Sequence, residues 1–163
     1  MREKVGSVFS IAKDNPPVAG CTISKQITDG KNPVLYFSMA PETDISAEVF
    51  PYYKLLFLCE GNLEVYGDDS FSVQLSRGDG MLTQADRPVG MRTTNGAVFT
   101  EQMILKEDMM NAAIKAGEVF QLAALVPYQE GKIVNMDLVH NDKMKFVLMA
   151  FDEGTGLSEH AAP

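Results

Sequence analysis

The sequence predicts an all-β protein built as a closed barrel or a sandwich. Stretches that alternate apolar and polar residues recur between Cys21 and Leu105, and glycine-rich turn signals separate them. In the longest stretch, which begins at Ala97, Phe99 and Met103 share a face with Glu101. Many short strands at this spacing are typical of sandwiches and closed barrels. We therefore expect the first two-thirds of the chain to form one all-β domain.

Turn signals divide the predicted strands from one another. In chain order the strands are Lys54–Cys59, Leu63–Tyr66, Phe71–Leu75, a short strand from Met81 that ends by Pro88 and Gly90, Ala97–Leu105, Lys132–Val139 and Lys145–Phe151. The first two are separated by the turn signal Glu60-Gly61-Asn62, and the last two by the turn composition His140-Asn141-Asp142.

One helix is predicted between the barrel and the C-terminal strands. Asp108 can cap a helix over Met109–Ala116, and Gly117 is a residue type that commonly follows a helix end. Met110 and Ile114 lie on one face at i, i+4 spacing, which predicts that this face packs into a core. We expect the helix to link two units.

Two stretches of the chain resemble each other. The residues Val8, Phe9, Ala12 and Gly20 recur as Val119, Phe120, Ala123 and Gly131, an offset of 119 − 8 = 111. The residues Thr43, Ser46 and Pro51 recur as Thr155, Ser158 and Pro163, an offset of 163 − 51 = 112. A repeat of about 110 residues predicts a first domain over 1–106, the linker helix over 107–117, and an incomplete second unit over 118–163.

The composition argues against several classes of function. A net charge of −8 and a pI near 4.7 disfavour nucleic acid and anionic membranes as partners. No apolar run is long enough to span a bilayer, and the start at Met1 lacks the apolar core of a signal peptide. Cys21 and Cys59 are widely spaced and predict reduced thiols. We expect a cytoplasmic protein.

The segments Leu55–Gly67, "LLFLCEGNLEVYG", and Leu75–Gly90, "LSRGDGMLTQADRPVG", resemble the cupin superfamily. In cupins an apolar strand runs into Glu-Gly, a second strand follows, and Gly-Asp leads to a strand that closes at a Pro/Gly turn. The resemblance covers about Ile45–Leu105, and Phe146–Pro163 is similar to the opening of a second cupin barrel. It implies a double-stranded β-helix (RmlC-like jelly-roll) barrel in a two-barrel chain truncated within its second barrel. Together with the predicted short linker helix, this gives an all-β fold with one helix.

Metal-using cupins carry His-x-His, a Glu four residues later, and a further His. The matching positions in the first unit are Glu48, Phe50, Lys54 and either Val89 or Thr93, none of which is histidine. We therefore expect no metal cofactor in the first barrel. In the second unit His160 matches the first ligand, but Ala162 replaces the second. One imidazole does not make a site, so only a complete second barrel could hold a divalent transition metal.

Lys54 opens an otherwise apolar strand, and the cupin resemblance points it into the barrel together with Glu48. A buried ammonium needs a carboxylate partner or loses its proton. We hypothesise that Glu48 and Lys54 form an ion pair in place of the metal, below Tyr52 or Tyr53, and that these four residues bind a small polar or carboxylate-bearing ligand. The alternative is that Lys54 lies at the barrel mouth with its ammonium in water.

These observations lead to two hypotheses about function. In the first, the first barrel is a metal-free module that binds a small molecule or has a structural role. In the alternative, the protein is a metal-dependent enzyme of the dioxygenase or isomerase type, with its site in the incomplete second barrel. The unpaired strand edges of an incomplete barrel favour pairing with another chain. We therefore predict a homodimer through β-strand exchange or addition over Lys132–Phe151.

Overall fold

A computed structural model describes residue 4 and residues 6–159, and most of this chain is strand or turn. The strands are β1 (Thr22–Gln26), β2 (Val34–Met39), β3 (Thr43–Val49), β4 (Tyr53–Tyr66), β5 (Ser72–Ser76), β6 (Asp79–Leu82), β7 (Pro88–Thr93), β8 (Ala97–Ile104), β9 (Met109–Met110), β10 (Val119–Gln121), β11 (Ile133–His140) and β12 (Lys145–Phe151). The helices are α1 (Ile11–Asp14) and α2 (Leu122–Leu125). Neither described helix has the length and apolar character needed to cross a bilayer.

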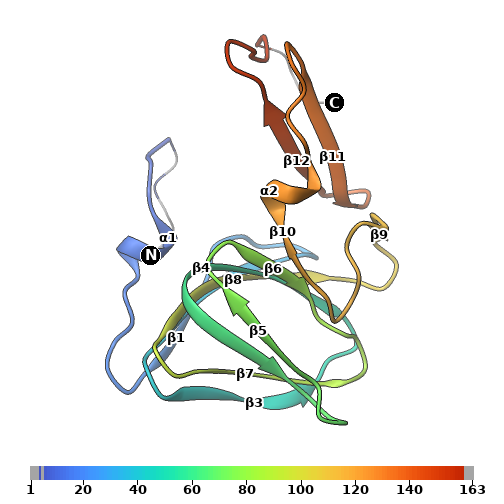
Figure 1. The fold of residues 1–163 in the computed structure, drawn as a ribbon. Helices are drawn as coiled ribbons and strands as arrows, with labels where there is room; N and C mark the ends of the chain where they lie inside the picture. The colour runs from blue at the N-terminus through green and yellow to red at the C-terminus, as the bar shows by residue number, and fades with distance from the viewer. Residues whose placement is uncertain (1–3, 5, 160–163) are drawn as a thin grey trace.

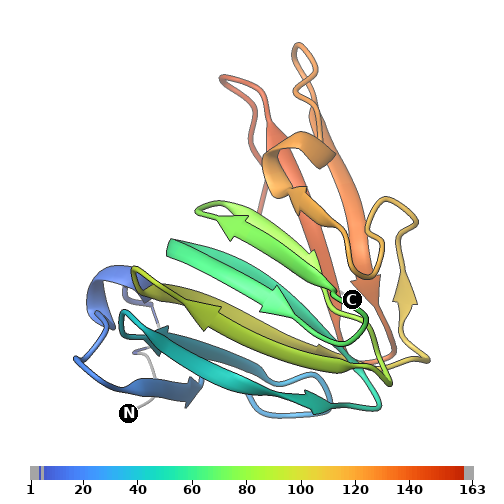
Figure 2. The same cartoon turned by 60° about the horizontal axis from the view of Figure 1, so that its bottom comes forward.

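Strands β1 to β8 form a barrel of two facing sheets (Figures 1 and 2). One sheet has the order β1-β2-β8-β4-β6, and β10 adds to its β6 edge. In the other, β3 pairs with β7, β7 with β4, and β4 with β5. All these pairs are antiparallel, and β4 belongs to both sheets. The prediction of an all-β jelly-roll barrel is therefore confirmed.

Strand β4 turns the corner between the two sheets without a break. The predicted turn at Glu60-Gly61-Asn62 is wrong, because β4 continues through it with a β-bulge between Leu58 and Glu60. Gly61 has φ +82°, and a Cβ added there would lie 2.0 Å from the carbonyl oxygen of Gly96. The glycine thus permits a close approach and a bend, and the strand does not reverse. Pro88, predicted to close a strand, instead begins β7.

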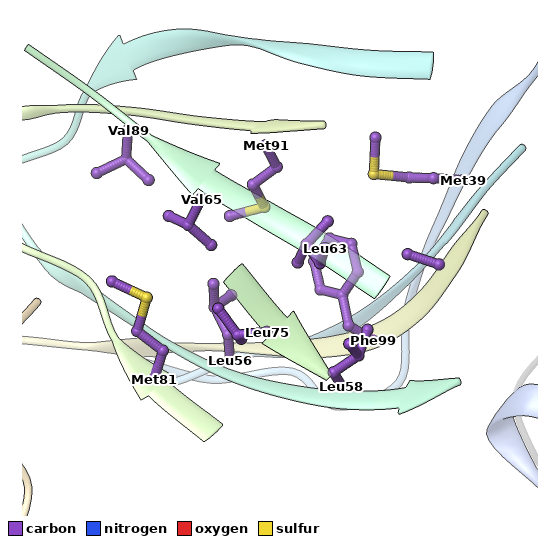
Figure 3. Close-up of a cluster of buried hydrophobic side chains, with 11 residues drawn as sticks. Met39, Leu56, Leu58, Leu63, Val65, Leu75, Met81, Val89, Met91 and Phe99 are labelled. Carbon is purple, nitrogen blue, oxygen red and sulfur yellow. The ribbon is translucent and has the colours of Figure 1, made fainter. Parts of the chain in front are cut away.

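Apolar side chains fill the interior of the barrel (Figure 3). Alternate residues of each strand point to the same side of a sheet, so one set from every strand faces inward. The buried members of this set are Met39, Leu56, Leu58, Leu63, Val65, Leu75, Met81, Val89, Met91, Ala97 and Phe99, each at most 5% exposed. The ring of Phe37 on β2 stacks on that of Phe99 on β8, with centroids 5.1 Å apart. The pocket that a ligand-binding barrel would need is therefore filled over most of its length.

A second sheet, with the order β12-β11-β9, stands beside the barrel (Figure 1). It packs on the outer face of β4 and β8, where Leu55 and Ile104 join Leu138 and Val139 in a second apolar cluster. The rings of Phe57 on β4 and Phe146 on β12 lie 5.7 Å apart in the same cluster. The central strands of the barrel are thus covered on both faces.

The predicted helix over 109–116 is wrong. Met109 and Met110 form β9, which pairs with β11, and the residues that follow are turns. The Asp108 carboxylate accepts a hydrogen bond from the Leu105 N–H at 2.8 Å, so it closes a turn and does not cap a helix. Burial of the apolar side chains was predicted correctly, since Ile114 is buried and Met110 packs on the second cluster. Pairing with β11 therefore overrides the helical spacing of these residues.

Asp108 is also the centre of a polar network that joins the barrel to the turn between β11 and β12. Asn32 donates to Asp108 Oδ2 at 2.7 Å, and Asn141 donates to Asp108 Oδ1 at 2.8 Å. The Asn141 amide also donates to Asn32 Oδ1 at 2.9 Å, and the Asn32 amide to the Met103 carbonyl at 3.0 Å. Asp108 and Asn32 are buried. Such a network is stabilising only while every member has its partners.

We predict that Asp108→Ala destabilises the protein, because the Asn32 amide, the Asn141 amide and the Leu105 N–H each lose a hydrogen bond to the carboxylate. The expected loss is about 2–3 kcal/mol, which lowers Tm by roughly 6–9 °C. Differential scanning calorimetry measures both quantities. The control is Asp142→Ala, which removes an exposed carboxylate one residue from Asn141 and should leave Tm unchanged. Equal Tm values for the two variants would contradict a stabilising role for the network.

Candidate functional site

Lys54 and Glu101 form a buried ion pair on the inner side of the barrel. Lys54 lies on the same side of β4 as Leu56, and Glu101 on the same side of β8 as Phe99. Lys54 Nζ is 3.3 Å from Glu101 Oε2, and each side chain is 10% exposed. The ammonium therefore lies in the protein and not in bulk water.

The carboxylate partner differs from the predicted one. Glu48 is exposed on β3, and the carboxylate paired with Lys54 comes from β8. The alternation of β8 could have identified Glu101 as the partner, because Glu101 is the charged residue on the face that Phe99 and Met103 share. Glu48 was predicted because it matches a metal-ligand position of the cupin motif, and none of the matched positions lies on β8.

The surroundings of Lys54 hold it in place. The backbone N–H of Lys54 donates to Thr83 Oγ1 at 2.8 Å, and the backbone carbonyl of Lys54 accepts from the Thr83 N–H at 2.9 Å. The Phe50 ring lies over the ammonium, with Nζ 3.8 Å from the ring centroid. The Tyr52 ring lies 5.3 Å from that of Phe50. Aromatic side chains of the segment between β3 and β4 therefore cover the ion pair.

The electrostatics of this end of the barrel follow from burial. Burial raises the pKa of Glu101, and the neighbouring Lys54 ammonium only partly offsets the effect. The pKa of Tyr52 is raised as well, first by burial and then by the Glu101 and Glu48 carboxylates. Tyr52 therefore lies in the field of both carboxylates. Tyr53 packs with the second apolar cluster on the outer side of the barrel, away from the ion pair.

The side chains at the cupin metal positions do not fit a metal ion. Lys54 presents a cation, which repels a divalent cation, and Phe50 covers it. Val89 is part of the barrel core, and Thr93 Oγ1 donates to the Asn62 carbonyl. In residues 4 and 6–159, no group of three or more His, Cys, Asp or Glu side chains is placed to hold a metal ion. His160 lies outside the described residues, so its role as a ligand stays a prediction.

A second polar site lies on the outer face of the barrel, in a cavity of about 340 Å³ between β3, β4, β5 and β7. There Arg92 donates to both carboxylate oxygens of Glu64, at 2.6 and 2.8 Å, and Ser72 Oγ donates to Glu64 Oε1 at 2.7 Å. The guanidinium also lies over the Tyr66 ring, 5.0 Å from its centroid. The hydrogen bonds from Arg92 and Ser72 lower the pKa of Glu64 to about 2. Sequence analysis missed this site, because Glu64 and Arg92 are 28 residues apart and no motif joins them.

We predict that Lys54→Met destabilises the protein at neutral pH, because it strands the buried Glu101 carboxylate. The expected loss is about 2–4 kcal/mol, or roughly 5–10 °C in Tm. The double variant Lys54→Met/Glu101→Leu should recover much of the loss, since it removes the stranded charge as well. Denaturant unfolding measures both variants, and an unchanged stability of Lys54→Met would show that the ion pair contributes nothing.

The same variant should change the pH dependence of stability. Because the pKa of Glu101 is raised above 4.5, the folded state binds its proton more readily than the unfolded state. Its contribution to stability is complete below about pH 4.5 and declines as the pH rises through the folded pKa. Without the Lys54 cation this pKa rises further. The deficit of Lys54→Met should therefore shrink as the pH is lowered from 7 towards 4.5, and a deficit independent of pH would contradict the assignment.

A separate prediction concerns Glu64. In Arg92→Gln the guanidinium that lowers its pKa is gone, so the pKa of Glu64 should rise from about 2 towards the ordinary carboxyl value. Carbon-detected NMR titration of the side-chain carboxyl measures this directly. Arg77→Gln is the matched control, because Arg77 is an exposed arginine that pairs with Glu60. A Glu64 pKa near 4.5 in the wild-type protein would show that the bidentate pair does not form.

Comparison with known proteins supports one fold. No protein-family model and no curated protein matches the sequence. Among solved structures, a cupin 2 conserved barrel domain protein from Leptotrichia buccalis matches with a TM-score of 0.83 at 23% identity, over 99% of this chain and 72% of that one. A conserved protein of unknown function from Streptococcus pyogenes matches with a TM-score of 0.59 at 12% identity, over 64% of this chain and 92% of that one.

A cupin superfamily protein from Desulfitobacterium hafniense matches with a TM-score of 0.50 at 15% identity, over 53% of this chain and 80% of that one. At these identities the likeness concerns the fold alone. It agrees with the barrel of two antiparallel sheets that share β4. The chain therefore has the cupin fold, a double-stranded β-helix of the RmlC-like jelly-roll type.

Proposed function

We propose that the first barrel is a metal-free module that binds a small carboxylate-bearing or polar molecule at the end closed by Lys54 and Glu101. The observation that carries this proposal is the ammonium on the inner side of the barrel, 3.3 Å from its carboxylate partner. A buried cation is a specific recognition group for an anion, because its interactions are screened less than those at the surface.

The chemistry of the pair allows a ligand to replace Glu101. Burial raises the pKa of Glu101, so the pair holds a carboxylate that is easier to neutralise than an exposed one. A ligand carboxylate could take over the contact with Lys54 Nζ while Glu101 takes up a proton. Tyr52, half-buried beside the pair, offers a hydroxyl, and Glu48 lies exposed at the rim. Tyr53, which was predicted to bind the ligand, packs with the second apolar cluster on the outer side of the barrel. Its role would therefore be to hold β4 in place.

The test is a titration with acetate and with succinate, followed by NMR at the amides of Tyr52 and Lys54 and by Tm. Binding at the proposed site should shift both amides and raise Tm in the wild-type protein, and should be absent in Lys54→Met. Lys143→Met, which removes an exposed ammonium, should still respond. Shifts that survive in Lys54→Met, or no shift with either probe, would overturn the proposal.

A second candidate function is mechanical support for the C-terminal unit. It is favoured by the filled interior and by the apolar cluster through which β11 and β12 pack on the outer face of β4 and β8. In this case the Lys54–Glu101 ion pair contributes only to stability and has no role in binding. The two candidates differ in one observable: support predicts a Tm loss in Lys54→Met without any response of the wild-type protein to carboxylates.

A further inference from the structure

The C-terminal unit repeats the first strands of the barrel element by element. Helix α2 follows α1 at an offset of 122 − 11 = 111, and β11 begins 133 − 22 = 111 residues after β1. For the second strands the offset between matching residues is 151 − 39 = 112, since Ile133 pairs with Phe151 as Thr22 pairs with Met39. A backbone bond shows this directly: the Ala40 N–H donates to the Cys21 carbonyl, and the Asp152 N–H donates to the Lys132 carbonyl. The hairpin β11–β12 therefore corresponds to the hairpin β1–β2.

The two hairpins differ in what lies beyond the second strand. In the barrel, β2 pairs with β1 on one edge and with β8 on the other, both antiparallel. In the described chain β12 pairs with β11 alone, so its other edge is free (Figure 1). The edge of β2 that β8 covers is thus the edge that β12 leaves open.

The hydrogen-bonding groups at this open edge can be assigned. In an antiparallel pair, alternate residues turn their N–H and C=O groups to the same neighbour. The Asp152 N–H bonds to β11 through Lys132, so Val147, Met149 and Phe151 turn theirs away from β11. At the offset of 112 these residues correspond to Leu35, Phe37 and Met39, which pair with β8.

The side chains at the open edge are apolar and exposed. Met149 is 41% exposed and Phe151 is 39% exposed. Their counterparts, by contrast, pack in the barrel: Met39 is fully buried, and Phe37 stacks on Phe99. The strand contains no proline, and its one charged residue, Lys145, stands at its first position. Residues 147–151 therefore lack the charges and prolines that usually protect an edge.

We propose that β12 pairs with β12 of a second copy of this chain, antiparallel and about a two-fold axis at Met149. This register places Val147 opposite Phe151 of the partner subunit, which joins the exposed apolar side chains into one stripe. It also places Lys145, whose ammonium pairs with Asp137 of its own chain, near Asp152 and Glu153 of the partner subunit, so charges of opposite sign face each other at both ends. The resulting sheet continues β9-β11-β12 into the second copy.

The pairing stands independently of the proposed function, because no residue near Lys54 takes part in it. A strand that pairs with itself needs a register in which no like charges meet. The axis at Met149 satisfies this condition, since the two copies of Lys145 lie at opposite ends of the strand pair. The β8-covered edge of the homologous strand β2 shows that an edge of this kind takes a strand as its partner. The charge complementarity is the argument for a second copy as that partner.

The experiment measures the molar mass by light scattering over a dilution series of the whole chain up to about 100 μM, since a dimer of this kind depends on concentration. The expected mass is twice the 17.9 kDa of the chain. Met149→Lys places two ammonium groups opposite each other at the axis and should be monomeric with the fold retained by circular dichroism. Met149→Leu is the matched control and should stay dimeric. A wild-type monomer at the highest concentration would overturn the proposal.

A cross-link tests the register. In a background with Cys21→Ser and Cys59→Ser, Met149→Cys should form an intermolecular disulfide on mild oxidation, because directly opposed Cα atoms lie about 5.5 Å apart. Asn135→Cys, at an exposed position one strand further from the axis, should not, because three strand spacings of about 4.8 Å separate the two copies. Cross-linking of both variants alike, or of neither in a dimeric protein, would overturn the β12 pairing.

Discussion

The antiparallel pair of β4 and β8 carries two apolar cores, one on each face. On the inner face, alternate residues of both strands join the barrel core, and on the outer face Leu55 and Ile104 join the cluster with β11. Strands that are buried on both sides tolerate few polar residues. Lys54 and Glu101 are the charged side chains that these two strands bury, and they can be there because each supplies the counter-charge of the other.

Strand alternation and turn composition were enough to predict the all-β class and the extents of β8 and β12, and the cupin resemblance predicted the barrel. They failed where a residue has a different role in tertiary context. Gly61 reads as a turn in the sequence, but its close approach to Gly96 serves a bulge within a long strand. Likewise, Met109 and Met110 have helical spacing with Ala113 and Ile114, but pairing with β11 decides their conformation.

The candidate site was predictable in part for the same reasons. The cupin resemblance pointed Lys54 into the barrel, and the strand period places it on the same side of β4 as the buried Leu56. Its partner depends on which strands become neighbours, and β8 lies some 45 residues further along the chain, beyond the reach of local patterns. The Glu64–Arg92 pair has the same character: each residue alone reads as an ordinary solvated charge, and only the pairing of β4 with β7 brings them together.

The polar network at Asp108 has a consequence for folding. Its hydrogen bonds join Asn32 to Asp108 across 76 residues and Asn32 to Asn141 across 109 residues. Contacts of such sequence separation close large loops, and their entropic cost must be met before they form. The two hydrogen bonds of Asn141 require the turn between β11 and β12 to lie against the barrel. The complete network therefore reports that the C-terminal hairpin has docked on the barrel.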